Sequence, residues 1–184
     1  MKRVFFPSID CSSARRPVRL AAFAALTAFG LAAMSVQAQE KTIELGSLKV
    51  SVPSDKGATS ELATDELDNV PILRLQFPDT DIEAWRSSLR LEIPAPAAGN
   101  YTVVFHAKAE PAECYIDMRV YDFANQPNRE IIKAKAFKLE PDWQEFVYDF
   151  TIENTETAPV TVTWGGLARA NKTLSFRDVK LIKN

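Results

Sequence analysis

The feature that most constrains this chain is the strict alternation of apolar and polar residues in short runs after residue 40. In the segment 101–109, apolar side chains occupy every odd position, starting at Tyr101 and continuing through Phe105. Side chains that alternate with a period of two point to opposite faces of a β-strand, whereas an amphipathic helix repeats its apolar residues every three or four positions. The alternation therefore predicts an all-β fold.

Clusters of Pro, Gly, Asn and Asp separate these runs at fairly regular spacing. We expect about eight strands, at 43–52 with a break at Gly46, 70–77, 82–93, 101–109, 114–123, 145–152, 160–164 and 173–182. Many short strands joined by turns are typical of an antiparallel β-sandwich of jelly-roll topology. The only helix-like stretch, 59–67, is too short to connect parallel strands.

Residues 1–38 have the composition of a secretory signal peptide. Basic residues precede an uncharged apolar run from Leu20 to Met34, and the small-residue sequence Val36-Gln37-Ala38 follows it. This order is typical of a signal peptide that is cleaved before Gln39. A membrane anchor is the alternative, but the run is shorter than the roughly 20 apolar residues that span a bilayer. We expect a secreted or periplasmic protein without a membrane span after cleavage, formed by a single domain at 39–184.

Charge and residue counts exclude several classes of protein. The chain has 22 basic and 24 acidic residues and a net charge of −2, which gives no basic field for phosphate neutralisation, so a nucleic-acid partner is not expected. One His and two Cys do not make a Cys/His zinc cluster. Cys11 lies in the expected signal peptide, so Cys114 would remain without an internal disulfide partner.

The order of landmarks resembles that of carbohydrate-binding modules of families 4 and 9 and their relatives, the galactose-binding-like jelly rolls. These landmarks are the strand from Gly99 to Ala109, the alternating run after Tyr115, Trp143 at a strand start, and the closing sequence Asp178-Val179-Lys180-Leu181. The resemblance covers about residues 70–184. It implies a jelly roll that binds a polysaccharide or oligosaccharide. It also implies a structural calcium near Asp178, although Asp178 would equally serve as a hydrogen-bond partner of a turn.

A jelly roll of this kind binds its glycan across one sheet, where aromatic rings stack on sugars and polar groups bond to hydroxyls. One face of the strand 114–123 offers this mixture, because Tyr115, Asp117, Arg119 and Tyr121 alternate with apolar residues. The opposite face begins with Cys114 and belongs to the core. The alternative is a solvated sheet face on which the aspartate pairs with the arginine.

Two arginines and two tryptophans are further candidates whose expected positions follow from the strand pattern. Trp85 shares the parity of the apolar residues up to Ile93, which predicts a core position and directs Arg86 and Arg90 to the other face. Either arginine would bind sugar hydroxyls or a uronate carboxylate, or lie on a solvated rim. Trp164, which precedes two glycines, is open to both a stacking role and burial.

Binding without catalysis is the function that these residues favour. No nucleophile, zinc-protease, P-loop or dinucleotide motif is present, and the single His106 has no His or Cys partner on its strand. The alternatives are a structural or protein-interaction sandwich with a partner in the cell envelope, and a small glycoside hydrolase with unrecognised carboxylates. We expect a glycan groove formed by Arg86, Arg90, Tyr115, Asp117, Arg119, Tyr121 and Trp164.

Overall fold

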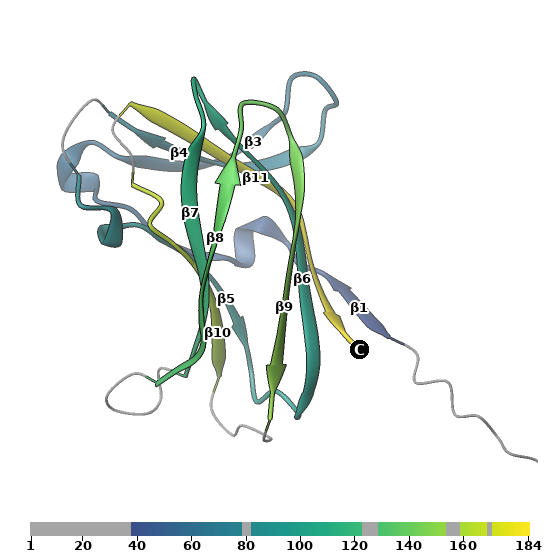
Figure 1. The fold of residues 1–184 in the computed structure, drawn as a ribbon. Helices are drawn as coiled ribbons and strands as arrows, with labels where there is room; N and C mark the ends of the chain where they lie inside the picture. Colours follow the sequence, from purple (N-terminus) through teal and green to yellow (C-terminus); the bar gives the residue numbers. More distant parts are fainter. Residues whose placement is uncertain (1–37, 79–81, 123–128, 154–158, 169–170) are drawn as a thin grey trace, which may run out of the picture. The chain divides into compact units, whose positions relative to one another are not determined.

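The computed structural model describes residues 38–78, 82–122, 129–153, 159–168 and 171–184 (Figure 1). These residues form eleven strands and three 3-10 helices of three residues each, η1 (Leu45–Ser47), η2 (Ser54–Lys56) and η3 (Ala84–Arg86). Within the described ranges, no helix has the length and apolar character needed to cross a bilayer.

Two antiparallel sheets pack face to face. The first sheet contains β1 (Gln39–Thr42), β3 (Thr59–Thr64), β4 (Pro71–Phe77), β6 (Gly99–Glu110), β9 (Gln144–Ile152) and β11 (Lys172–Lys183). The second contains β2 (Lys49–Ser51), β5 (Ser88–Ile93), β7 (Cys114–Asp122), β8 (Arg129–Leu139) and β10 (Val160–Gly165).

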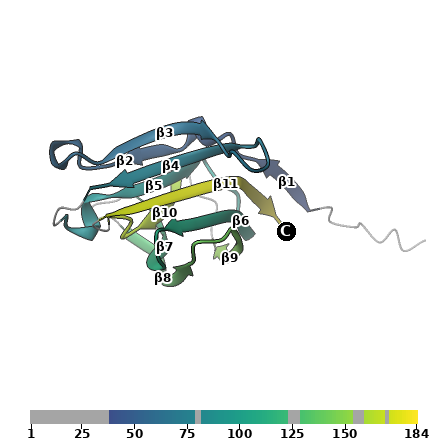
Figure 2. The same ribbon diagram turned by 90° about the horizontal axis from the view of Figure 1, so that it is seen from above.

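Strands that follow one another in sequence mostly lie in different sheets. The first sheet has the order β3-β4-β11-β6-β9 with β1 beside β11, and the second has the order β2-β5-β10-β7-β8. Figure 2 shows β4, β11 and β6 side by side in one layer. The predicted antiparallel β-sandwich is confirmed, and its connections are consistent with a jelly roll.

Three strands and one turn depart from the sequence-based expectation. The segment 59–64, which we read as helix-like, is the edge strand β3, and neither β1 nor β8 was among the eight expected strands. The expected strand 82–93 is interrupted, because η3 precedes β5. Edge strands are open on one side, so their apolar alternation is weaker and harder to detect.

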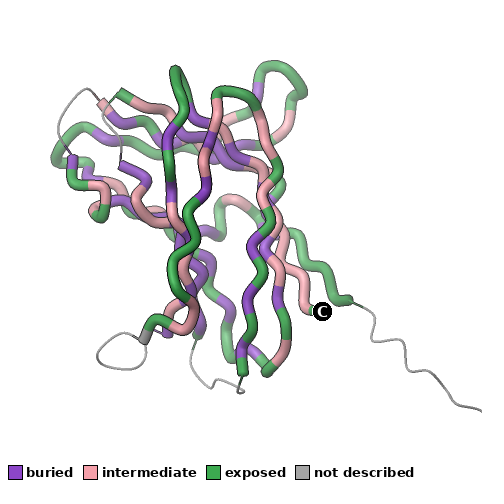
Figure 3. Tube along the Cα trace, viewed as in Figure 1, coloured by how far each residue is buried: buried purple, intermediate pink, exposed green. Residues whose placement is uncertain are grey.

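The core lies between the sheets and is filled by the alternating apolar residues. Figure 3 shows buried and more exposed positions alternating along the strands. Phe105 is fully buried and lies among aromatic rings, with Trp164 edge-on at 5.5 Å between centroids and Phe146 stacked at 5.3 Å. Burial of each such ring contributes on the order of 2 to 3 kcal/mol. Cys114 is buried, as its parity predicts.

Candidate functional site

A groove of about 570 Å³ lies on the outer face of the second sheet. Its floor comes from three neighbouring strands, β5, β10 and β7. Residues of η3, together with Ser87 and Gly166, complete the lining. The lining residues are Ala84, Trp85, Ser87, Ser88, Arg90, Asp117, Arg119, Tyr121, Thr163, Gly165 and Gly166. We call this set the groove. Its volume is in the range of small-ligand sites.

Strand periodicity explains why these residues meet. On each floor strand the groove residues alternate with buried core residues, such as Leu89 on β5 and Met118 on β7. Register then aligns them across the sheet, because Thr163 is the partner of both Arg90 and Arg119. Neighbouring strands are about 4.8 Å apart, so the Cα atoms of the two arginines lie roughly 10 Å apart on either side of Thr163.

Arg119 is held in place by its own strand. Its Nε donates to Asp117 Oδ1 at 3.1 Å, its Nη2 to Asp117 Oδ2 at 3.4 Å, and its Nη1 to the Tyr121 hydroxyl at 3.2 Å. The bonds to Tyr121 and Asp117 raise the pKa of Arg119, so its guanidinium is charged at any physiological pH. The pairing of the aspartate with the arginine, which we gave as the alternative to ligand binding, is therefore present, and it lies within the groove.

The strand next to β7 is irregular at this point. Met118 pairs with Lys135 and Val120 pairs with Ile132, so two residues of β8 stand opposite Arg119 alone. A bulge of this kind bends the strand and increases its local twist, and bulges are common beside functional sites. Here the extra residue is on β8, directly opposite Arg119 on β7.

Trp85 gives the groove an exposed aromatic ring. Its side chain is 76% exposed, the largest exposed fraction of any described aromatic residue. The ring is carried by η3, whose next residue, Arg86, donates to both carboxylate oxygens of Asp55 at 2.9 and 3.1 Å. Asp55 belongs to η2, so this ion pair ties the two 3-10 turns together and holds the position of Trp85.

Two hydroxyl groups of the groove are buried without a hydrogen-bond partner in the described structure. They are Oγ1 of Thr163, whose residue is 7% exposed, and Oγ of Ser87, whose residue is 1% exposed. Buried polar groups are normally paired, since an unpaired one costs about 1 to 3 kcal/mol. Both hydroxyls belong to the groove lining, so a bound ligand or an ordered water would supply the missing hydrogen bonds.

Two adjacent glycines, Gly165 and Gly166, leave the backbone without side chains on one part of the groove floor. A Cβ atom added to Gly165 would lie 2.6 Å from Asp117 Oδ1, so a side chain there would displace the carboxylate that holds Arg119. Gly166 has a φ of 63°, which disfavours residues with a side chain. The sequence Gly165-Gly166 therefore positions Asp117 and leaves room over the backbone.

The structure brings most of the predicted residues together. Arg90, Asp117, Arg119 and Tyr121 all line the groove. Tyr115 lies on the same face of β7 and is 56% exposed, but it is outside the groove lining. Arg86, which we expected in the groove, pairs with Asp55 instead.

The expected positions of two tryptophans are reversed. Trp164 is fully buried and packs on Phe105, so the prediction that it contributes to the groove is wrong. Trp85, expected in the core, is exposed and lines the groove. The parity argument failed for Trp85 because η3 breaks the strand, and parity along a strand does not continue through a helical turn.

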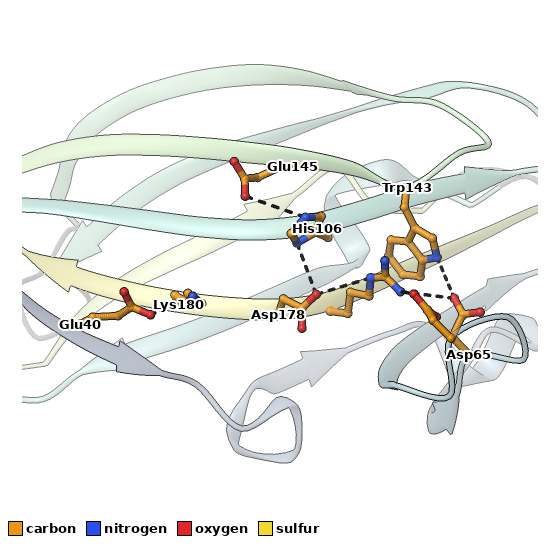
Figure 4. A network of polar contacts seen from close by, with 9 residues as sticks. Glu40, Asp65, His106, Trp143, Glu145, Asp178 and Lys180 are labelled. Carbon is orange, nitrogen blue, oxygen red and sulfur yellow. Dashed lines mark hydrogen bonds and ion pairs between the residues drawn. The ribbon is translucent and has the colours of Figure 1, made fainter.

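Asp178, the expected calcium ligand, belongs to a β-bulge. Between Arg177 and Lys180 the register of β11 shifts against β6, and Asp178 has a φ of 53°. Figure 4 shows its carboxylate near His106, with 3.5 Å between Oδ2 and Nδ1. The same oxygen lies 3.5 Å from Arg177 Nε, and no group of three or more His, Cys, Asp or Glu side chains that could hold a metal ion occurs among the described residues.

A second set of aromatic and charged residues lies on the outer face of the first sheet. We call it the Trp143 network, and it consists of Asp65, Asp68, Trp143 and Arg177 (Figure 4). The indole N–H of Trp143 donates to Asp65 Oδ2 at 2.7 Å, and the Arg177 guanidinium lies 4.3 Å from the ring centre. Both contacts are made within the protein, so Trp143 has a structural role here.

Sequence reasoning missed several groove residues, namely Trp85, Ser87, Thr163, Gly165 and Gly166. A signal for Trp85 was present, because the run Ala84-Trp85-Arg86-Ser87-Ser88 does not alternate between apolar and polar residues. This break marks the end of regular strand and favours a turn. Thr163 gave no comparable signal, since only the register of β10 places it between two arginines.

No protein-family model matches the chain, and no curated protein matches it either.

Comparison with solved structures gives clear matches. A structure described as "CBM4 structure and function" aligns with a TM-score of 0.59 and 20% identity, over 74% of this chain and 86% of that one. The CBM22-2 xylan-binding domain of Xyn10C from Paenibacillus barcinonensis aligns with a TM-score of 0.52 and 11% identity, over 77% and 94%. The CBM22-1-GH10 modules of a Clostridium thermocellum xylanase, complexed with xylohexaose, align with a TM-score of 0.54 and 11% identity, over 79% and 28%.

Because the sequence identities to these structures are low, the matches establish a shared fold and nothing further. The chain has the β-sandwich fold of carbohydrate-binding modules, and the resemblance expected from the sequence is confirmed at that level.

Proposed function

We propose that this protein, which has the fold of carbohydrate-binding modules, binds a polysaccharide or oligosaccharide in the groove without cleaving it. The observation that carries the proposal is the combination found there: the exposed indole of Trp85 beside the row Arg90, Thr163 and Arg119. An exposed ring and a set of hydrogen-bonding groups within one depression suit a ligand with both apolar and hydroxylated surfaces.

A sugar ring has these two kinds of surface. Its C–H groups would stack on the Trp85 indole, which is large, flat and exposed at the edge of the groove. Its hydroxyls would bond to Arg119, Asp117 and the Thr163 hydroxyl, which has no partner among the described residues. Tyr115, on the same face outside the lining, would contact a longer chain.

Catalysis is not part of the proposal. Most glycoside hydrolases use two carboxyl groups at a fixed separation across the scissile bond. Asp117 is the only carboxylate among the groove residues defined above, and both of its oxygens accept bonds from Arg119. The solved structures cited for their similar fold are described as carbohydrate-binding modules or contain them, which supports a binding role.

We also propose that the protein acts outside the cytoplasm, as a secreted or periplasmic protein, after removal of residues 1–38. Support comes from the composition of that segment and from the start of β1 at Gln39. Cleavage before Gln39 would leave every described strand intact.

The test is affinity electrophoresis of the purified protein in gels that contain a panel of soluble polysaccharides. We expect at least one of them to retard the protein, and Trp85→Ala to abolish most of the retardation. Leu67→Ala is the matched control, because Leu67 is 90% exposed in the turn after β3 and lies outside the groove.

Three results would contradict the proposal. One is the absence of retardation by every polysaccharide, together with the capture of an envelope protein by the unmodified chain, which would indicate an interaction module. Another is equal retardation of wild type and Trp85→Ala. The third is release of reducing ends from a retained polysaccharide, which would indicate a hydrolase.

A further inference from the structure

We propose that the groove selects an acidic polysaccharide, and that Arg119 recognises the carboxylate of a uronic acid residue. This inference rests on the proposed function, because it names the class of glycan that the same groove binds.

The first argument is the way in which Arg119 is held. A guanidinium has five N–H donors arranged in a rigid plane. Asp117 takes one donor on Nε and one on Nη2, and Tyr121 takes one on Nη1. In the contacts of the described residues, one N–H therefore remains on each Nη nitrogen. Asp117 binds along the edge formed by Nε and Nη2, so it leaves open the end of the guanidinium, toward which one N–H of each Nη nitrogen points.

Two N–H donors side by side match the two oxygens of a carboxylate. Such fork-like pairs are about twice as strong as hydrogen bonds between neutral groups, and their geometry is specific. Because Asp117 and Tyr121 fix the plane of Arg119, the arginine loses little side-chain freedom when the ligand binds. A vicinal pair of sugar hydroxyls fits the same donors but lacks the charge.

The second argument is the row of residues across the floor. Arg90 and Arg119 flank Thr163, so two positive charges lie on either side of a hydroxyl that has no described partner. The groove residues include two guanidiniums and one carboxylate. A bound carboxylate would accept charge-assisted hydrogen bonds from Arg119, whereas a neutral sugar would accept weaker ones.

The third argument is the contrast between the groove and the whole chain. The net charge is −2, so the protein has no general attraction for polyanions. Selectivity for an acidic glycan must then come from contacts in the groove. Bidentate contacts inside a depression are screened by salt much less than long-range attraction is.

The experiment compares each acidic polysaccharide with its own neutral form. Polygalacturonate, alginate and glucuronoxylan are used as such and after chemical reduction of their carboxyl groups, and the affinity of the purified protein for each is measured by calorimetry. We expect at least one acidic polymer to bind on the order of tenfold more tightly than its reduced form. This preference should persist between about 0.05 and 0.5 M salt, where the Debye length falls severalfold.

Variants test the residue assigned to the carboxylate. Arg119→Lys keeps the positive charge but removes the planar fork. It should weaken binding of the acidic polymer much more than binding of the reduced polymer, so most of the preference for the acidic polymer should be lost. Arg74→Gln is the matched control. Arg74 is an arginine of the other sheet that pairs with Glu61 at 3.0 Å, and its loss should leave the preference unchanged.

The outcomes separate this inference from the function on which it rests. Equal affinity for acidic and reduced polymers would overturn the preference and leave glycan binding in place. Failure of every polymer, acidic or neutral, to bind would overturn both. A preference that disappears at high salt, or that falls equally in Arg74→Gln and Arg119→Lys, would show unspecific attraction and would also overturn the inference. The comparison of the two polymers uses the wild-type protein, so it does not depend on the folding of any variant.

Discussion

The outer faces of the two sheets each carry a tryptophan, an arginine and an aspartate, but the two sets are arranged differently. In the Trp143 network, Trp143 bonds to Asp65 and lies against Arg177, while Arg177 also pairs with Asp68. In the groove, Asp117 holds Arg119, and Trp85 is 76% exposed.

The difference shows that residue types alone do not mark a binding site. In the Trp143 network all three kinds of side chain contact one another and stabilise the protein. In the groove the aspartate and the arginine are paired, but the tryptophan ring stays exposed and is available to a ligand. Asp65 is 5% exposed and accepts a bond from the Leu67 backbone as well as from Trp143. The Trp143 network thus connects the end of β3, β11 and the start of β9 and stabilises the fold. Substitutions in the network should change stability, whereas substitutions in the groove should change ligand binding.

The largest effect is expected for Asp65→Ala. This change would leave the Trp143 indole N–H and the Leu67 backbone N–H without their carboxylate acceptor, while Arg177 would keep its ion pair with Asp68. The free energy of unfolding should fall by about 3 kcal/mol. Urea denaturation measures this change. Glycan affinity below the unfolding transition should stay as in wild type. A stability change under about 0.5 kcal/mol would mean that the network is no more than an ordinary surface cluster.

The next effect is expected for Trp85→Ala and concerns binding. Loss of a tryptophan that anchors a ligand typically removes about 2 kcal/mol, which corresponds to roughly a 30-fold weaker affinity. Because the ring is exposed, the free energy of unfolding should change by less than about 0.5 kcal/mol. Calorimetric titration and urea denaturation of the same preparation check both values. A large loss of stability with unchanged affinity would reverse the assignment of the two regions.

Thr163→Val should produce smaller and opposite changes in stability and affinity. Valine has nearly the same shape but lacks the buried hydroxyl that has no described partner, so stability should rise by about 1 kcal/mol while glycan affinity falls by a similar amount. Tyr148→Phe is the control, since this hydroxyl is also buried without a described partner, and burial raises the pKa of Tyr148 to about 12. Tyr148→Phe should raise stability and leave affinity unchanged. Equal affinities for Thr163→Val and wild type would exclude the hydroxyl from the binding site.

The smallest effect concerns the pH dependence of stability. Hydrogen bonds from the Leu67 N–H and the Trp143 indole, with the charges of Lys108 and Arg177, hold the pKa of Asp65 below its ordinary value, against the opposing effect of burial. A carboxyl group with a lowered pKa in the folded state adds stability above its unfolded pKa, and this is lost as the pH falls through the folded pKa. The melting temperature should therefore decline below about pH 4, and less steeply in Asp65→Asn. Parallel curves for the two proteins would contradict the role of Asp65.

The sequence predicted the parts of the fold that follow from regular alternation. The strands around Phe105 and Met118 alternate cleanly, because one face of each contacts the core and the other does not. The same alternation placed Asp117, Arg119 and Tyr121 on one face of β7, where the structure has them. Prediction failed at β3, an edge strand whose residues are mostly exposed, so that burial imposed no period on its sequence.

What the sequence determined by itself is the two-layered β fold and the face to which most strand residues point, because the period of two is a local property of an extended chain. The tertiary structure decided which tryptophan is buried. The turn η3 carries Trp85 away from the core, and Trp164 packs on Phe105. It also decided that Thr163 lies between Arg90 and Arg119, since the register between strands far apart in sequence depends on the packing of the whole sandwich.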